Sequence, residues 1–175
     1  VRISPEQGLY IINLDAAQAE QILDLTGDSA QTPFESSVAC IGASICQIGA
    51  RDSQKLLAAC VQAARDAGLP GNALPQIHIS GCPSSCGTHQ IGTLGFRGAV
   101  KQTPDGPKAA FAMFEGGRET LGREQFGADV CVMAKEDIPK FFIELGQRIA
   151  QDGSSYDTWI LDNRDVMLEL AKKYA

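Results

Sequence analysis

Two cysteines stand directly after a predicted strand in the segment Ile79-Ser80-Gly81-Cys82-Pro83-Ser84-Ser85-Cys86-Gly87. They are the main indication of the kind of site that the chain carries. That strand covers residues 76–80, where polar and apolar residues alternate. Glycine and proline around the two cysteines favour a loop after it. A second cysteine pair lies upstream, in Ala39-Cys40-Ile41-Gly42-Ala43-Ser44-Ile45-Cys46. The small residues of both segments would let backbone N–H groups approach an anionic cofactor closely.

The spacing of these four cysteines is C-x5-C for Cys40 and Cys46, and C-x3-C for Cys82 and Cys86. On spacing alone, three kinds of site stay open. Structural zinc sites prefer C-x2–4-C at both ends, so the first pair is long for zinc. Disulfides lack any accompanying sign of secretion, and four cysteines allow three pairings. A 4Fe–4S cluster needs four thiolates, whose spacing varies between proteins, and it is the interpretation that we favour.

The composition is that of a globular protein of one domain, or of one domain plus a fragment. The chain has 175 residues, of which 44% are hydrophobic and 21% charged. These values exclude collagen, a long coiled coil and wholesale disorder. We expect no membrane span, because an apolar run of ~20 residues is missing. A net charge of −6 argues against a nucleic-acid partner. Six cysteines are too few for a disulfide scaffold, and we expect a cytoplasmic protein.

The first residues indicate either processing or a piece of a longer chain, because the sequence opens with Val1 rather than methionine. A strand is predicted over residues 8–14. Asp15 then offers an N-cap for a helix, with Gln18 as its capping-box partner. The polar segment 27–36, which contains glycine and proline, is predicted to be a linker or domain boundary.

The rest of the chain mixes strands and helices. The predicted elements are a helix over 52–67, strands over 76–80, 92–96 and 109–114, a helix capped by Asp137 and a last helix over 163–174. This mixture indicates an α/β or α+β protein. We expect a mixed β-sheet with helices packed on it, and both cysteine pairs on loops that converge at one edge.

Taken together, the two cysteine pairs and their glycine- and proline-rich context resemble the nitrite/sulfite reductase haemoprotein family. The stretch 89–98, which ends in Gly-Phe-x-Gly, and the later Gly116-Gly117-Arg118 are similar to that family as well. The resemblance covers nearly the whole chain and implies an α+β fold. It implies that residues 1–32 are the end of a ferredoxin-like half-domain and a linker. Residues 33–175 would be the domain that binds a 4Fe–4S cluster and sirohaem.

The resemblance also implies a site and a reaction. Cys40, Cys46, Cys82 and Cys86 would hold the 4Fe–4S cluster, and Cys86 would also be the axial ligand of the sirohaem iron. The reaction would be the six-electron reduction of nitrite or sulfite. The partners would be the preceding half of the same enzyme, which carries the basic anion clamp, and an electron donor such as ferredoxin or a flavoprotein. We therefore interpret the chain as the C-terminal part of a larger reductase, inactive alone.

Two departures from the family pattern leave the reduced anion open. Ser84 stands where the family usually has Asn, and Thr93 stands where an acidic residue is common. Three alternatives are kept: a precorrin-3B synthase-like enzyme, a haem-free 4Fe–4S electron-transfer module, and a zinc-stabilised interaction domain.

Five further residues have competing interpretations. Arg97 and Arg118 are candidates for contact with sirohaem carboxylates, with surface ion pairs as the alternative. His89 is a candidate hydrogen-bond or proton donor near the site, or an ordinary loop histidine. Cys60 and Cys131 are predicted to be core thiols.

Overall fold

The structure, a computed structural model, describes residues 1–4, 7–27 and 29–175. Asp28 belongs to the polar linker predicted over 27–36, and that part of the prediction lies outside the described residues. The chain divides into two compact units, Val1–Gln31 and Thr32–Ala175. The ferredoxin-like character of the first segment stays a prediction.

The first unit is a short hairpin followed by a helix. Its elements are β1 (Arg2–Ile3), β2 (Leu9–Tyr10) and α1 (Ala16–Leu25). The predicted capping box is confirmed: the Gln18 N–H donates to the Asp15 carboxylate at 2.8 Å, and the Asp15 N–H donates to the Gln18 side chain at 3.1 Å. The prediction of a strand over 8–14 is wrong in its length, because within that range only Leu9 and Tyr10 pair with β1.

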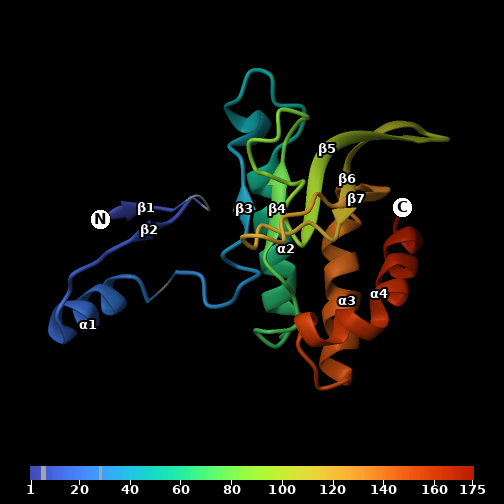
Figure 1. The fold of residues 1–175 in the computed structure, drawn as a ribbon. Helices are drawn as coiled ribbons and strands as arrows, with labels where there is room; N and C mark the ends of the chain where they lie inside the picture. The colour runs from blue at the N-terminus through green and yellow to red at the C-terminus, as the bar shows by residue number, and fades with distance from the viewer. Residues whose placement is uncertain (5–6, 28) are drawn as a thin grey trace. The chain divides into compact units, whose positions relative to one another are not determined.

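The second unit is built on a five-stranded mixed sheet (Figure 1). In spatial order, its strands are β3 (Val38–Ala39), β4 (Ile77–Ser80), β5 (Leu94–Thr103), β6 (Gly106–Glu115) and β7 (Ala128–Ala134). β3, β4 and β5 run parallel, whereas β5, β6 and β7 are antiparallel. Parallel neighbours need a crossover connection, which contains α2 (Ser53–Asp66) between β3 and β4. β3 and β4 therefore end at the same edge of the sheet, and a cysteine pair follows each.

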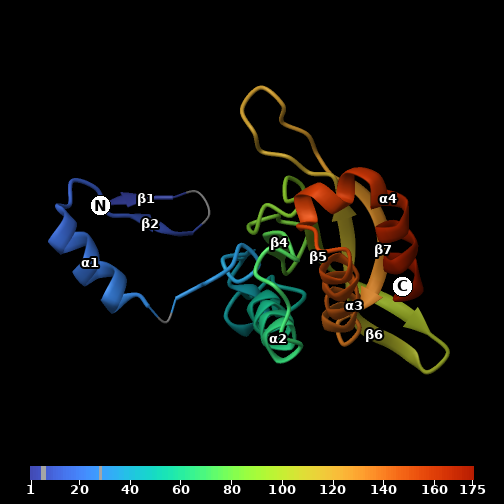
Figure 2. The same cartoon turned by 90° about the horizontal axis from the view of Figure 1, so that it is seen from below.

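Three helices share one core with the sheet (Figure 2). They are α2, α3 (Ile138–Gln151) and α4 (Tyr156–Lys173). Alternate residues of the central strands supply the sheet side of this core, among them the fully buried Ile77, Ile79, Leu94 and Phe96. The expected α+β class, with a mixed sheet and helices packed on it, is confirmed.

Four predictions about element ends need correction. The last helix begins at Tyr156 rather than at residue 163, because the polar Asn163 marks only a kink, with φ −120° and ψ 21°. Asp137 precedes α3, but its carboxylate accepts a hydrogen bond from the Lys140 ammonium at 2.7 Å rather than from the helix backbone. β5 runs from Leu94 to Thr103 rather than over residues 92–96, and β6 begins at Gly106 rather than at residue 109.

Three strands were missed, namely the two-residue strands β1 and β3 and the longer strand β7. β7 carries the sequence Ala-Asp-Val-Cys-Val-Met-Ala, and it pairs with β6 through a register shift between Met113 and Phe114. Its burial rises from exposed to buried along the strand, so the alternation that marks a strand in sequence is weak here.

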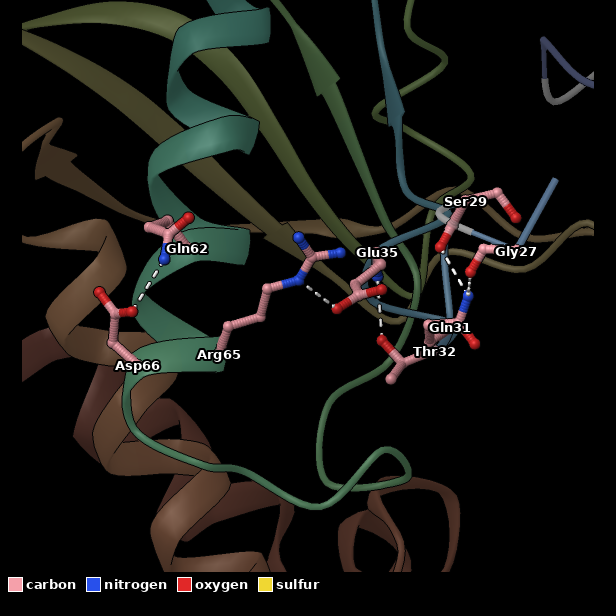
Figure 3. A network of polar contacts seen from close by, with 8 residues as sticks. All are labelled: Gly27, Ser29, Gln31, Thr32, Glu35, Gln62, Arg65 and Asp66. Atoms are coloured by element: carbon pink, nitrogen blue, oxygen red, sulfur yellow. Dashed lines mark hydrogen bonds and ion pairs between the residues drawn. The ribbon is translucent and has the colours of Figure 1, made fainter. Parts of the chain in front are cut away.

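An ion pair ties the start of the second unit to α2 (Figure 3). The Arg65 guanidinium donates to the Glu35 carboxylate at 2.7 Å, and the Glu35 N–H donates to the Thr32 hydroxyl at 3.2 Å. Residues 32–36, which the sequence assigned to a linker, are thus held against a helix. Among the described residues, the structure contains no helix long and apolar enough to cross a membrane.

Phe142 offers the sharpest test of this core. Its ring is fully buried. The centroid of this ring lies 4.9 Å from the ring centroid of Phe34, 5.6 Å from that of Phe96 and 5.2 Å from that of Phe141. We predict that Phe142→Ala lowers the free energy of unfolding by about 3–5 kcal/mol, because a large cavity replaces the ring.

The matched control is Phe126→Ala, since the Phe126 side chain is 76% exposed. It should change stability by no more than about 0.5 kcal/mol. Urea titration followed by the fluorescence of the single tryptophan, Trp159, measures both variants. Equal destabilisation by the two changes would contradict this description of the core.

Candidate functional site

The two cysteine pairs follow neighbouring parallel strands. Cys40 comes directly after β3, and Cys82 comes two residues after β4. The register pairs Val38 with His78 and Ala39 with Ile79, so the segments that follow β3 and β4 leave the sheet side by side. The loops over 40–52 and 81–93 therefore start from one edge, as expected from the sequence.

Arg51 joins the two loops to each other and to the sheet. Its N–H donates to the Gly81 carbonyl at 2.9 Å, and its own carbonyl accepts the Ala43 N–H at 2.9 Å. Its side-chain Nε donates to the carbonyl of Ala99 in β5 at 2.8 Å. One residue of the first loop thus fixes the positions of the second loop and of a third strand.

Gly81 is required where the two loops meet. A Cβ at this position would lie 2.4 Å from the Arg51 carbonyl oxygen and 3.2 Å from the Gly42 Cα. Both neighbours are backbone atoms, which cannot swing away as a side-chain tip can. The approach of the two cysteine loops therefore depends on the missing side chain.

The first loop holds its two cysteines differently. The Cys40 sulfur accepts a hydrogen bond from the Gly81 N–H at 3.1 Å and lies 3.2 Å from the Ser53 hydroxyl. Cys46 follows a short 3-10 turn, η1 (Gly42–Ser44), and its N–H donates to the Gly42 carbonyl at 2.9 Å. Both thiols are half-buried.

The second loop holds Cys82 half-buried and Cys86 exposed. Hydrogen bonds from Ser84 lower the pKa of the Cys82 thiol below its ordinary value, and the bond from the Ser84 hydroxyl has a larger effect than the bond from its backbone N–H. A hydrogen bond from the Ala50 N–H lowers this pKa by a smaller amount. Cys86 is exposed, and its thiol makes a long 3.9 Å contact to the Ser84 carbonyl. The Ala50 contribution is a second sign that the loops converge, because Ala50 belongs to the first loop.

Local contacts fix the backbone around Cys86. Ser85 and Thr88 both have positive φ, 61° and 50°, which is uncommon for residues other than glycine. The Gln90 side chain donates to the Ser85 hydroxyl at 2.6 Å, and the Thr88 hydroxyl lies 2.8 Å from the His78 Nδ1. These contacts hold Cys86 at the outside of the loop.

The described thiols are not gathered as a site for a single ion. Among the described residues, no group of three or more His, Cys, Asp or Glu side chains is placed so that it could hold one metal ion. Thiolates around one zinc, each about 2.3 Å from the metal, would stand about 3.8 Å apart. The four described cysteines lie on loops that start from one edge of the sheet, but they do not form such a site.

His89 is buried behind the second loop. Its Nδ1 lies 3.0 Å from the Ser80 hydroxyl, its ring centroid is 4.9 Å from that of Phe114, and the residue is 2% exposed. Burial, together with the positive charge of Arg97, lowers the pKa of His89 to about 4. His89 is therefore neutral near pH 7 and is unsuited to act there as a general acid.

The two arginines lie in different settings. Arg97 places its guanidinium over the Phe114 ring, 5.1 Å from the centroid. Arg118 pairs through its backbone with Gln125 and lines a cavity of about 440 Å³ together with Glu119 and Asp157. The sirohaem contacts suggested for both arginines stay predictions.

The two remaining cysteines belong to the core. Cys60 is fully buried, and this burial raises the pKa of its thiol far above the ordinary value. Cys131 is half-buried, and desolvation raises the pKa of its thiol to about 11. Thiols that resist ionisation are poor metal ligands, so the prediction of a structural role is confirmed for Cys60 and agrees with the setting of Cys131.

Sequence reasoning missed Arg51, Ser53 and Gln90, which position the cysteine loops. Ser53 is the first residue of α2, after the N-cap Asp52, and its hydroxyl contacts Cys40. The contacts of Ser53 and Arg51 reach residues 13 and 48 positions away, which local sequence does not show.

Comparison with known proteins gives a fold likeness. No protein-family model and no curated protein sequence matches this chain. Among solved structures, the chain is similar to the Mycobacterium tuberculosis NirA protein, with a TM-score of 0.73 and 20% sequence identity over 95% of this chain. It spans 33% of the length of that protein. The chain thus has a nitrite/sulfite reductase-like fold, and at this identity the likeness extends to the fold alone.

The Gly81 contact yields a prediction. We expect Gly81→Ala to lower the free energy of unfolding by about 1–3 kcal/mol, because the new methyl group meets the Arg51 carbonyl. Gly27→Ala is the control, since a Cβ there would lie 3.6 Å from its nearest neighbours. Urea denaturation measures both variants. A Gly81→Ala protein as stable as the control would show that the loops can separate without cost.

His89 predicts a pH dependence of stability. The folded pKa of about 4 lies below the ordinary value of about 6.5, so the unfolded chain binds a proton in this range while the folded chain does not. The contribution of His89 is therefore complete above pH 6.5 and is lost as the pH falls toward 4, by roughly 2–3 kcal/mol.

The measurement compares the unmodified chain with His89→Gln by denaturation at several pH values. The unfolding free energy of the unmodified chain minus that of His89→Gln should fall as the pH falls from 6.5 to 4, because only the unmodified chain carries this titration. A difference independent of pH would mean that His89 titrates normally in the folded protein.

Proposed function

We propose that this chain is the cluster-bearing C-terminal part of a nitrite/sulfite reductase-like oxidoreductase. The observation that carries the proposal is the convergence of the two cysteine loops, joined by the Arg51–Gly81 hydrogen bond at the shared edge of β3 and β4. The likeness in fold to NirA supports it. The order and context of the cysteine pairs, which resemble the nitrite/sulfite reductase haemoprotein family, support it as well.

The residues present fit a 4Fe–4S cluster. Cys40, Cys46, Cys82 and Cys86 supply four soft sulfur donors, the ligands that iron–sulfur clusters use. The Gly81 N–H bond to the Cys40 sulfur is the kind of contact that stabilises a ligand thiolate.

Cys86 would also bind the iron of sirohaem. It is the exposed member of the second pair, while Ser85 and Gln90 fix the loop that carries it. When bound, the two cofactors would supply one-electron steps to an anion such as nitrite or sulfite. The chain itself contributes the four thiolates and a rigid backbone. His89 is buried and neutral near pH 7, so we assign proton delivery to other groups.

The electrostatics assign anion binding to another part of the protein. The chain carries a net charge of −6, which opposes the approach of nitrite or sulfite. A basic clamp from the preceding part of the enzyme would complete the site, and a ferredoxin or flavoprotein would donate electrons. A cytoplasmic location, and the choice between nitrite and sulfite, stay predictions from the sequence.

The roles of Cys86 and Cys40 separate the proposal from a haem-free electron-transfer module. In the longer protein to which this chain is proposed to belong, Cys86→Ser should disturb both the cluster and the haem, because it removes a shared ligand. Cys40→Ser should damage the cluster first. Cys131→Ala, which removes a thiol with a high pKa, is the control and should leave both centres intact.

Electron paramagnetic resonance reads the haem spin state and the cluster signal of these variants separately. A Cys86→Ser protein with an unchanged haem axial ligand would refute the bridging role and leave Cys86 at most a cluster ligand. A protein that contains the cluster and lacks any haem absorption would favour the electron-transfer module.

A further inference from the structure

The parallel hydrogen-bond ladder between β3 and β4 ends in an unusual way at Cys40. The Cys40 N–H donates to the Ile79 carbonyl at 3.0 Å, as a parallel ladder requires. The next bond in such a ladder would run from the Gly81 N–H to the Cys40 carbonyl. The Gly81 N–H instead donates to the Cys40 sulfur at 3.1 Å.

Ser53 takes the place of Gly81 at the Cys40 carbonyl. Its hydroxyl donates to that oxygen at 2.7 Å and lies 3.2 Å from the Cys40 sulfur. The carbonyl is thereby satisfied, and the Gly81 N–H is released for the sulfur. A buried carbonyl left without this partner would compete for the same N–H, because an unpaired buried acceptor is costly.

The position of Ser53 leaves its hydroxyl little freedom. The residue is fully buried at the first turn of α2. A Cβ on Gly42 would lie 2.6 Å from the Ser53 nitrogen and 2.7 Å from its hydroxyl oxygen, so the loop closes tightly over it. Gly42 itself has a φ of +65°, which suits glycine. Water is kept away, so only the protein can replace the contacts of this hydroxyl.

We propose that Ser53 is a positioning residue that directs the Gly81 N–H onto the Cys40 sulfur and thereby sets the reduction potential of the cluster. This inference rests on the proposed function. Reduction adds negative charge to a cluster and its thiolates, and hydrogen bonds to the sulfurs stabilise that charge. Removing the Ser53 hydroxyl would return the Gly81 N–H to the carbonyl and make the cluster harder to reduce.

The test compares Ser53→Ala with Ser44→Ala after anaerobic reconstitution of the chain with iron and sulfide. Ser44 lies in the same loop, but its hydroxyl donates to the Ile41 carbonyl at 2.9 Å and serves as the control. Redox titration followed by electron paramagnetic resonance gives each midpoint potential. Ser53→Ala should shift the midpoint to a more negative value, whereas Ser44→Ala should match the unmodified chain.

Ser53→Thr keeps the hydroxyl and is the second variant, with folding checked by Trp159 fluorescence. It should retain the original midpoint, and a shift equal to that of the alanine variant would assign the effect to packing and overturn the inference. Equal midpoints in Ser53→Ala and the unmodified chain would also overturn it, while leaving the proposed function intact. An unmodified chain that takes up no cluster would instead contradict the proposed function, and the inference with it.

Discussion

The contact between Gly81 and Arg51 is the constraint on which the candidate site depends. Two parallel strands end side by side, and their loops can stay together only if one of them carries no side chain at the meeting point. The Arg51 N–H then reaches the Gly81 carbonyl, and its side chain reaches across to Ala99. This arrangement keeps the loops of four cysteines from distant parts of the sequence at one edge of the sheet.

The fold places its core cysteine and its loop cysteines in different environments. The aromatic core around Phe142 and the three helices make the sheet rigid, and they bury Cys60 where its thiol cannot ionise readily. The four cysteines of the loops are half-buried or exposed. Cys40 accepts a hydrogen bond from the Gly81 N–H, and Cys82 accepts hydrogen bonds from Ser84. Burial and hydrogen bonding thus separate inert thiols from candidate ligands in one chain.

Local signals explain what the sequence could predict. Asp15 and Gln18 are three residues apart, and the apolar residues Leu56 and Cys60 of α2 are four apart, so both helices could be predicted without tertiary information. β3 could not, because its two residues become a strand only by pairing with β4, 40 positions along the chain. The choice of the four cysteines came from their spacing and context. Their support by Arg51 and Ser53 arises from contacts that only the folded chain creates.

We propose that the two loops hold one iron–sulfur cluster together. Iron, acid-labile sulfide and zinc, measured per chain after anaerobic purification and reconstitution, test it most directly. We expect about four irons and about four sulfides per chain, without stoichiometric zinc. One zinc per chain without sulfide, or a chain that binds neither metal under these conditions, would contradict it.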